Sequence, residues 1–389
     1  MSRKLYPFVA LLIVLAFVLA ACSPATPTQA PEQTQEAAQP TQAGEAPVET
    51  VIVTVEVPAE APSGQASQPS GYGAIVQRIL DRGQLVCGGR TDLAGFGELD
   101  ANGRNIGFDI DICRAVATAL FNDPDAMEVV PLTAAERGPA LQTGEVDVLS
   151  RNATWTTTRD AQWGNFTWVV FYDGQGFMVP ADSGITDIEQ LDGATICVTS
   201  GTTTELNLAD AFRQRGLDFT PLTFEDTASV YGSYEEGRCD ATTSDKSQLA
   251  AVRSGFADPA AHTILDITIS KEPLTPAVPS GDDQWFDIVK TVVWGLINAE
   301  ELGVTQANVQ DMINSDDVKV QRLLGTEGSW GQADLGLDQD VMVNVIGAVG
   351  NYGEIYDRYM GPDGVSFTLD RGLNNLWTNG GLIYGIPLR

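Results

Sequence analysis

The sequence predicts an α/β protein with two lobes, each built on a mainly parallel sheet. From Gln84 to Leu149, strand-like and helix-like segments alternate as β-α-β-α-β. This order favours a parallel sheet with helices on both faces. The same alternation returns between Ala194 and Ser254, so the chain contains two α/β units of similar length. Two parallel sheets imply two lobes.

The elements of the first unit follow from apolar spacing and from glycine punctuation. Ile112, Val116 and Leu120 recur at helical spacing and predict a helix over 108–121. A second helix over 134–144 ends at a glycine. The expected strands cover 84–88, 127–132 and 146–149.

The second unit and the C-terminal part are predicted in the same way. In the second unit the expected strands cover 194–198, 219–223 and 239–243, and the expected helices cover 202–215, 226–236 and 244–254. After Pro273 the chain is expected to be mainly helical, with a long amphipathic helix over 285–302 and others near 306–314, 317–324 and 338–359. Trp285, Trp294 and Trp377 are expected in the core.

The N-terminal residues indicate export. Arg3 and Lys4 precede an apolar run of about a dozen residues, which is too short to span a membrane comfortably. Small residues then lead to Cys22, as in a bacterial lipobox. We expect 1–21 to be a lipoprotein signal peptide and Cys22 to carry the lipid, the alternative being an ordinary signal peptide with a chance cysteine. The Pro/Gln/Ala-rich residues 22–70 cannot bury a core and are expected to form a disordered tether.

The composition excludes several classes of function. The net charge of −30 argues against nucleic-acid binding. His262 is the only histidine, and no CxxC spacing occurs, so neither a metal nor another cofactor is expected.

Polar turns follow the predicted strands at the edge where α/β sheets bind ligands. After the strand over 146–149 come Asn152, Thr154 and Arg159. A guanidinium can bind a carboxylate bidentately, although a solvated polar loop is the alternative. Asp245 follows the strand over 239–243 and suits an ammonium group, or it caps the next helix.

A glycine-threonine turn forms the third of these sites. Gly201, Thr202 and Thr203 open the helix over 202–215, where free N–H groups could bind an anion or where a side chain could simply cap the helix. Groups for a carboxylate together with one for an ammonium describe an α-amino acid.

From Gln84 to Arg389 the chain resembles the general L-amino-acid-binding proteins of bacterial ABC importers. The stretches that carry the resemblance include Gly144-Glu-Val-Asp-Val-Leu-Ser-Arg-Asn152, Tyr172-Asp-Gly-Gln-Gly-Phe-Met-Val-Pro180, Gly201-Thr-Thr-Thr-Glu-Leu-Asn-Leu208 and Gly281-Asp-Asp-Gln-Trp-Phe-Asp-Ile-Val-Lys290. The resemblance implies a two-lobed periplasmic-binding-protein fold of type II, with two parallel-rich sheets joined by a two-strand hinge. Lobe 1 would comprise 71–173 and 274–389, including extra C-terminal helices, and lobe 2 would comprise 174–273.

The resemblance also implies a function and a set of contacts. A lipid-anchored monomer on the extracytoplasmic face would capture L-amino acids between its lobes and deliver them to the membrane subunits of the importer. Arg159 would bind the ligand carboxylate and Asp245 its ammonium. The other implied contacts are Asn152, Thr154, Gly201, Thr202 and Thr203.

The turn after the first strand departs from the family pattern. Where many relatives place a tyrosine against the ligand side chain, this sequence has Leu93, with Phe96 three residues on. Arg90 at the same turn would either favour acidic ligand side chains or point to solvent.

The four remaining cysteines fall two in each lobe. We expect Cys87–Cys113 and Cys197–Cys239 disulfides, since each stays within one lobe, whereas a bridge between lobes would lock the cleft. Free buried thiols are the alternative.

Two other functions are alternatives to transport. An enzyme on this fold, such as a lyase or dehydratase, would need a general acid or base in the cleft, and His262 lies outside the three turns. A ligand sensor would need a separate signalling partner.

Overall fold

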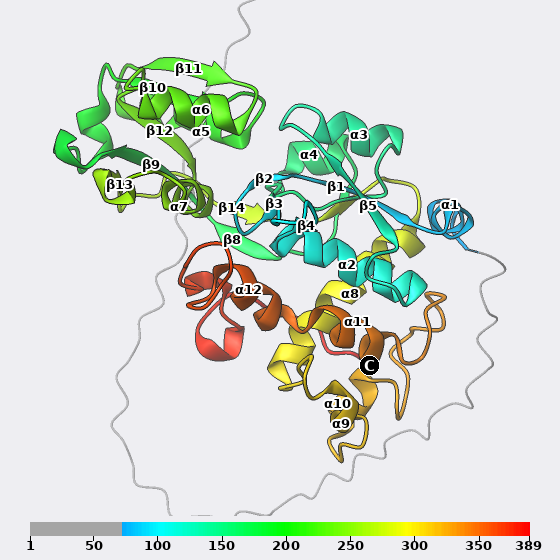
Figure 1. The fold of residues 1–389 in the computed structure, drawn as a ribbon. Helices are drawn as coiled ribbons and strands as arrows, with labels where there is room; N and C mark the ends of the chain where they lie inside the picture. Colours follow the sequence, from blue (N-terminus) through cyan, green and yellow to red (C-terminus); the bar gives the residue numbers. More distant parts are fainter. Residues whose placement is uncertain (1–71) are drawn as a thin grey trace, which may run out of the picture. The chain divides into compact units, whose positions relative to one another are not determined.

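The structure is a computed structural model that describes residues 72–389. Two five-stranded sheets, each covered by helices, are connected through a two-stranded sheet of β8 (Phe171–Asp173) and β14 (Glu272–Leu274) (Figure 1). This arrangement confirms the predicted fold class. The expected signal peptide, Cys22 and the tether lie outside the described residues.

The sheet of lobe 1 has the strand order β5-β1-β6-β15-β7. Its strands are β1 (Leu85–Gly89), β5 (Met127–Pro131), β6 (Val148–Leu149), β7 (Asn165–Phe166) and β15 (Ala277–Val278). β1 pairs parallel with β5 and β6, as predicted, whereas β15 pairs antiparallel with β6 and β7. The sequence did not predict β7 and β15, because a two-residue strand has no readable alternation.

Helices cover both faces of this sheet. They are α2 (Phe108–Phe121) on one face and α3 (Arg137–Thr143) with α4 (Thr157–Gln162) on the other, while α1 (Ala74–Arg82) precedes β1. Leu85 and Cys87 of β1 pack into the core beside α2, and Val86 between them packs into the core beside α3. Both faces of β1 are therefore buried, as expected for a central parallel strand. A small antiparallel sheet of β2 (Asp92–Leu93), β3 (Gly97–Leu99) and β4 (Asn105–Ile106) was not predicted.

The sheet of lobe 2 has the order β11-β10-β12-β9-β13. Its elements are β9 (Gln175–Pro180), β10 (Thr195–Thr199), α5 (Thr203–Arg215), β11 (Thr220–Phe224), α6 (Thr227–Glu235), β12 (Ala241–Asp245), α7 (Lys246–Ser254) and β13 (His262–Ile264). β10 pairs parallel with β11 and β12, while β9 pairs antiparallel with β12 and β13.

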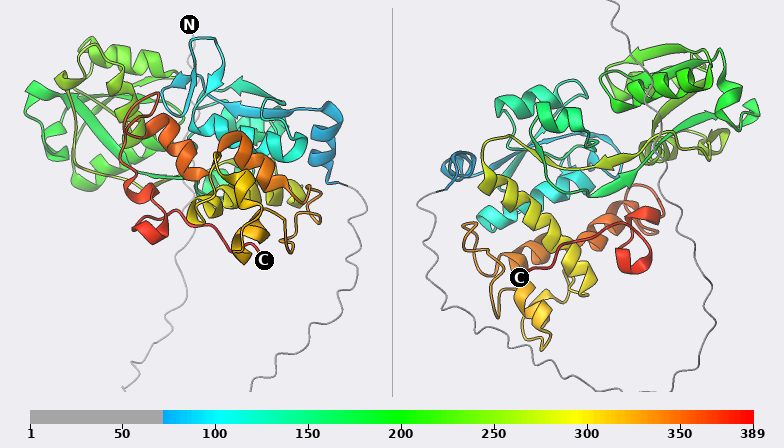
Figure 2. Two further views of the ribbon diagram at one scale, coloured as in Figure 1. Left: turned by 60° about the horizontal axis from the view of Figure 1, so that its bottom comes forward. Right: turned by 180° about the vertical axis from the view of Figure 1, so that it is seen from behind.

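The C-terminal helices pack beside α2 on lobe 1 (Figure 2). They are α8 (Asp283–Glu301), α9 (Val309–Met312), α10 (Val318–Leu323), α11 (Val341–Val349) and α12 (Tyr352–Met360). The single helix expected near 338–359 is wrong, because Gly350 adopts a positive φ of 83° and ends α11. Asn351 then starts α12 with a reciprocal cap: its side chain accepts from the Glu354 N–H, and the Glu354 carboxylate accepts from the Asn351 N–H, each at 2.9 Å.

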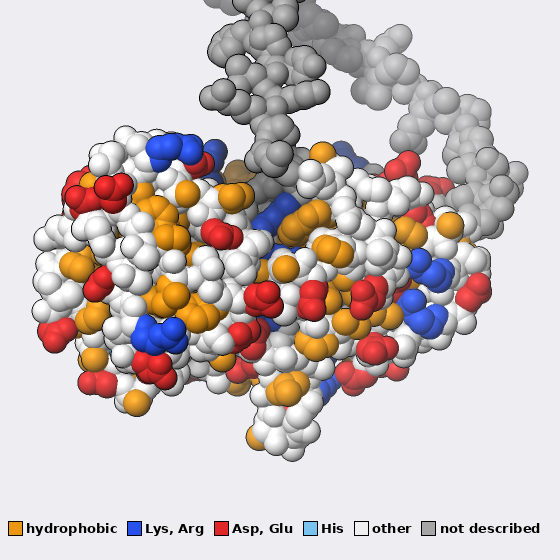
Figure 3. All heavy atoms as spheres, turned by 90° about the horizontal axis from the view of Figure 1, so that it is seen from above, with side chains coloured by type: hydrophobic (Ala, Val, Ile, Leu, Met, Phe, Trp, Pro, Cys, Tyr) orange, Lys and Arg blue, Asp and Glu red, His pale blue; other side chains and the backbone are white. Residues whose placement is uncertain are grey.

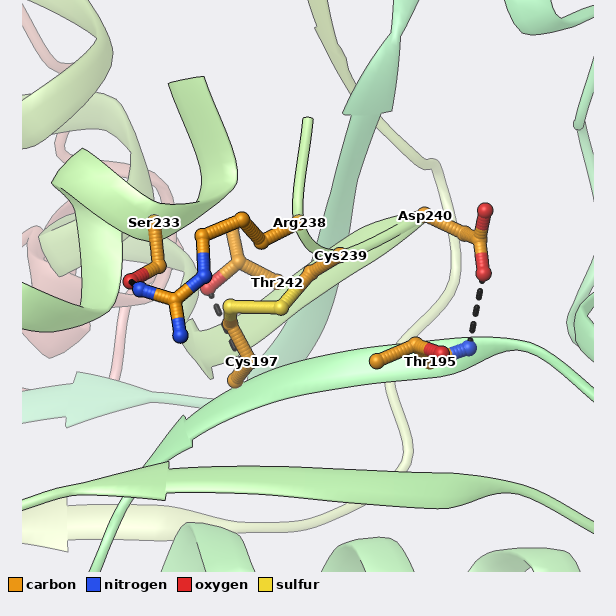
Figure 4. Close-up of a disulfide and its surroundings, with 7 residues drawn as sticks. All are labelled: Thr195, Cys197, Ser233, Arg238, Cys239, Asp240 and Thr242. Carbon is orange, nitrogen blue, oxygen red and sulfur yellow. Dashed lines mark hydrogen bonds between the residues drawn. A yellow bond between two sulfur atoms is a disulfide. The ribbon is translucent and has the colours of Figure 1, made fainter. Parts of the chain in front are cut away.

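The structure contains both expected disulfides, Cys87–Cys113 and Cys197–Cys239. The second joins β10 to the turn before β12 (Figure 4). Beside it, the Thr242 hydroxyl donates to the Cys197 carbonyl at 3.2 Å, and the Asp240 carboxylate accepts from the Thr195 N–H at 2.7 Å. These contacts hold β12 in register with β10.

Among residues 72–389, no helix is long and apolar enough to cross a membrane.

Candidate functional site

A cavity of about 30 Å³ lies at the carboxyl ends of strands from both sheets. Arg90 follows β1, Asn152 follows β6, Thr202 follows β10, and Asp245 ends β12. Its walls are formed by Arg90, Ala134, Arg137, Arg151, Asn152, Thr154, Thr199, Thr202, Thr203, Thr204, Thr227, Thr243, Ser244, Asp245 and Gln248. Figure 3 shows basic side chains within a hollow of the surface. The strand-end turns of the two units therefore meet at one site.

Arg90 points into this cavity and joins the two lobes. Its Nη1 donates to Asn152 Oδ1 and to Gln248 Oε1, both at 3.1 Å, and its Nη2 donates to the Thr227 hydroxyl at 2.9 Å. Its Nε forms an ion pair with Asp92 at 2.8 Å. The side chain is 2 % exposed, so the alternative that it points to solvent is excluded.

Two further arginines, which the sequence did not predict, line the cavity. Arg151 donates through Nε to the Leu132 carbonyl at 2.6 Å, and Arg137 donates to the Ala134 carbonyl at 3.2 Å. Within residues 72–389, neither forms an ion pair with a carboxylate. Burial lowers the pKa of Arg151 to about 9, and it lowers the pKa of Arg137 as well. Both guanidiniums would therefore gain from an anion placed in the cavity.

Sequence order could have revealed only one of these two arginines. Arg151 directly follows β6, within the polar turn that already suggested a site. Arg137 begins α3 and reaches the cavity only because α3 packs on the sheet.

Arg159 is not among the residues that line the cavity. It belongs to α4, its Nη1 donates to the Thr154 carbonyl at 3.0 Å, and its guanidinium lies 4.6 Å from the ring centre of Trp163. Burial lowers its pKa to about 10, although Glu272 and Asp245 oppose this shift through their charges. It is near Asp245 without lining the cavity, so its predicted contact with a ligand carboxylate stays a prediction.

Asp245 is a buried carboxylate that faces the cavity. It precedes α7 but makes no capping hydrogen bond to it, which rules out the alternative of a simple helix cap. Burial raises its pKa well above the ordinary value, and the nearby Asp173 and Glu272 add to the rise. A cation in the cavity would stabilise the ionised form.

The glycine-threonine turn contributes two of its three expected residues. Thr202 and Thr203 line the cavity, and Gly201 does not. The Thr202 hydroxyl accepts from the Glu205 N–H at 3.1 Å, so Thr202 also caps α5. Capping and proximity to the site therefore coexist, as the sequence allowed.

The expected contribution of Leu93 and Phe96 to a side-chain pocket stays a prediction. Both are fully buried in the core beside α2, and neither lines the cavity. Phe96 packs edge-on against Phe171 at 5.3 Å, because the β2–β3 hairpin turns these side chains inward. At this turn Arg90, rather than the apolar residues after it, faces the cavity.

Glu272 on β14 was also missed by the sequence reasoning. Its carboxylate accepts from the hydroxyls of Thr154 at 2.6 Å and Thr203 at 3.0 Å, from Asn207 Nδ2 at 2.8 Å and from the Ser270 hydroxyl at 2.5 Å. Thr154 follows β6 in the sheet of lobe 1, whereas Thr203 and Asn207 belong to α5 of lobe 2. One buried carboxylate at the connection between the lobes therefore holds side chains of both.

Comparison with known proteins identifies the family. The bacterial extracellular solute-binding proteins, family 3, match residues 85–310. The chain belongs to this family. It is 51 % identical over 313 residues, which is 80 % of this chain and 92 % of the relative, to the general L-amino acid-binding periplasmic protein AapJ of Rhizobium johnstonii.

Two further relatives extend the comparison. The glutamate/glutamine/aspartate/asparagine-binding protein BztA of Rhodobacter capsulatus is 46 % identical over 323 residues, covering 82 % of this chain and 95 % of BztA. A solved ABC transporter periplasmic binding protein from Brucella ovis, with glutathione bound, is 48 % identical with a TM-score of 0.78, covering 81 % of this chain and 99 % of that one. These relatives are named as binding proteins, so the family member described here is an extracytoplasmic solute-binding protein and not an enzyme.

Proposed function

We propose that this protein captures L-amino acids of several kinds in the cleft between its lobes and delivers them to an ABC importer. The observation that carries the proposal is the distribution of charge around the cavity. Arg137 and Arg151, which have no carboxylate partner among residues 72–389, face a cavity that Asp245 also lines. An α-amino acid offers a carboxylate to Arg137 and Arg151 and an ammonium group to Asp245. The names of AapJ and BztA support this class of ligand.

In the proposed complex Asp245 binds the ammonium, and the arginines bind the α-carboxylate. We keep the prediction that Arg159 binds the α-carboxylate. Arg137, which lines the cavity, is the alternative partner for this carboxylate. Arg90 is held by the neutral acceptors Asn152 and Gln248, which a ligand side chain can replace. A carboxylate or an amide oxygen in the ligand side chain would bind to Arg90. An amino acid without such a group can still bind, because Asn152 and Gln248 then remain the acceptors for Arg90.

Calorimetric titration with glutamate, glutamine, leucine and 2-oxoglutarate tests this proposal. Removing one partner of a buried charged contact costs about 2–5 kcal/mol, so Asp245→Asn should weaken amino acids roughly thirtyfold or more while affecting 2-oxoglutarate far less. Arg159→Ala and Arg137→Ala should identify which guanidinium holds the carboxylate. Unchanged affinity in Asp245→Asn for every amino acid would show that the ammonium site is misassigned.

Glutathione is a second candidate ligand because a protein 48 % identical to this chain has been solved with it bound. It carries an ammonium and two carboxylates, which match Asp245 and the several arginines of the site. Adding it to the same titrations separates the two possibilities. Tighter binding of glutathione than of any amino acid would make the tripeptide the preferred ligand.

We further propose that the protein is anchored to the membrane as a monomer. The lipobox-like sequence before Cys22 and the polar composition of 22–70 support a lipid at Cys22 followed by a tether. The two lobes, 71–173 with 274–389 and 174–273, would then close on the ligand through β8 and β14.

A further inference from the structure

A second cavity, of about 240 Å³, lies in the C-terminal helical part of the protein. It is formed by the end of α8, by α10 and by the last residues of the chain, and it shares no residue with the cleft between the lobes. Its walls consist of Asn298, Glu301, Leu302, Lys319, Arg322, Leu323, Trp377, Tyr384, Gly385, Pro387, Leu388 and Arg389. Residues 311–389 lie beyond the segment that the family matches.

Side-chain contacts hold the C-terminal segment in place over α8. Asn298 Nδ2 donates to the Ile386 carbonyl at 2.9 Å, and Trp168 Nε1 donates to the Tyr384 carbonyl at 2.9 Å. Gly385 packs so closely that a Cβ there would come within 2.7 Å of Asn298 Nδ2. The cavity is therefore built by fixed contacts between the segment and the helix.

The cavity has an apolar interior with an aromatic wall. Leu323 is buried at its base, and Leu302 and Leu388 line it as well. The rings of Trp377 and Tyr384 lie edge to face with their centres 5.5 Å apart. Such a lining favours a flat or aliphatic ligand body.

Apolar side chains also gather on the surface around this cavity. Nine large hydrophobic residues are exposed among residues 72–389, and four of them fall between 373 and 384. They are Leu373 (56 % exposed), Trp377 (50 %), Leu382 (49 %) and Tyr384 (46 %). The expectation that Trp377 lies in the core is thus wrong, and a concentration of this kind on the surface of a folded domain is typical of a binding site.

The charge at the cavity differs from that of the chain as a whole. Lys319 and Arg322 are three residues apart on α10 and therefore project from one face. Neither side chain forms an ion pair or a hydrogen bond with any residue in 72–389. The carboxylate of Glu301 already accepts from Trp377 Nε1 at 3.0 Å. In a chain with a net charge of −30, two unpaired cations mark this place as suited to an anion.

We propose that this cavity is a second ligand site, which binds a small monocarboxylate with an aromatic or aliphatic body. The body lies against Leu302, Leu323 and the Trp377 ring, and the carboxylate pairs with Lys319 and Arg322. Lys319 and Arg322 outnumber the Glu301 carboxylate, which already accepts from Trp377, so an added ammonium group on the ligand would be repelled more than it is attracted. The site therefore selects simple carboxylates over α-amino acids, the reverse of the selection proposed for the cleft.

Saturation-transfer NMR and Trp-fluorescence titration on the whole protein test this site with 3-phenylpropanoate as the probe. The neutral 3-phenylpropan-1-ol should bind at least about threefold more weakly, because it lacks the charge. L-Phenylalanine should also bind at this site more weakly than 3-phenylpropanoate does. This comparison is made in the Asp245→Asn variant, in which binding of amino acids in the cleft is weakened. Since Lys319 and Arg322 lie at the rim, their replacement should leave the fold intact, as far-UV circular dichroism will check.

Matched variants decide the outcome. Lys319→Gln/Arg322→Gln should weaken 3-phenylpropanoate at least about tenfold, whereas Arg213→Gln, which removes an exposed cation from α5, should leave it unchanged. The Asp245→Asn variant should bind 3-phenylpropanoate with the same affinity as the parent protein. The proposal is overturned if the probe shows no saturable binding up to about 10 mM. It is also overturned if binding survives in the double variant or is lost in Asp245→Asn, since the probe would then occupy another site.

Discussion

Glu272→Gln tests whether one carboxylate at the connection between the lobes stabilises the joined arrangement. Glu272 accepts from Thr154 on the side of lobe 1 and from Thr203 and Asn207 on the side of lobe 2. It does not line the cavity itself, although Thr154 and Thr203, which it holds, do. Glutamine keeps the size and shape of the side chain but turns one acceptor oxygen into a donor.

The size of the effect follows from the hydrogen bonds that are lost. A hydrogen bond to a charged group contributes about 1.5–3 kcal/mol. The Nδ2 of Asn207 donates at 2.8 Å and cannot accept from a new donor, while a threonine hydroxyl can rotate and accept instead. Weakening the contacts to both lobes should therefore cost the joined arrangement about 3 kcal/mol. If ligand binds only when the lobes meet, affinity should fall by up to roughly a hundredfold.

Calorimetry and stopped-flow fluorescence measure this effect, with Ser270→Ala as the matched control. Ser270 donates to the same carboxylate at 2.5 Å but lies two residues from it in the same segment, so its removal breaks no link between the lobes. We expect a faster ligand off-rate in Glu272→Gln and a much smaller change in Ser270→Ala. Equal affinities for Glu272→Gln and the parent, or an equal loss in both variants, would refute the reasoning.

Three further predictions concern the rest of the chain. The Cys197→Ser/Cys239→Ser variant should lose about 4 kcal/mol of unfolding free energy in urea, from a loop closed over 42 residues; an unchanged midpoint would show that this bridge contributes nothing. Burial and Glu272 raise the pKa of Asp173 from 3.8 to about 6, so the folded protein binds this proton more tightly and loses stability as pH rises between these values. Asp173→Asn should then be more stable than the parent above pH 6 but not below pH 4 in thermal melts. Cys22→Ala should release the folded protein from the membrane fraction, and continued pelleting with membranes would count against lipidation.

The fold could be predicted because each unit has its own local signals. Helix α2 has the bounds expected from its apolar spacing, and each lobe has its three parallel strands. The antiparallel strands β9 and β15 could not be placed, because their partners are set by how the chain crosses between the lobes. Such pairing depends on contacts distant in sequence, which a local pattern does not encode.

The site could be predicted where residues directly follow a strand. Asp245 lies at the cavity for that reason, since the carboxyl ends of both sheets meet there. Glu272 could not be found in this way, because its importance comes from donors on two other elements. Phe96 packs in the core beside Phe171, a placement set by a short hairpin that the sequence pattern did not predict.

The shifted pKa values in the cleft lead to a last prediction, about protons exchanged on binding. Burial makes the charged form costly for Asp245, whose pKa is raised, and for Arg151, whose pKa falls to about 9. An amino acid supplies each with a counter-charge while adding no net charge itself. Its ammonium lowers the pKa of Asp245, so at a pH where this carboxyl is partly protonated, binding must release a proton.

Arg151 takes no part in this exchange near pH 6, because it is already fully charged there. Titrating leucine over a series of pH values in buffers of different ionisation enthalpy should therefore reveal proton release wherever this carboxyl is partly protonated, and that release should disappear in Asp245→Asn. Proton uptake would refute the assignment, and undiminished release in the variant would mean that another carboxyl, such as Asp173 with its pKa of about 6, gives up the proton. Release that depends on Asp245 would instead show why a zwitterion suits this cleft: a ligand lacking the ammonium supplies no counter-charge to this carboxylate and forgoes that ion pair.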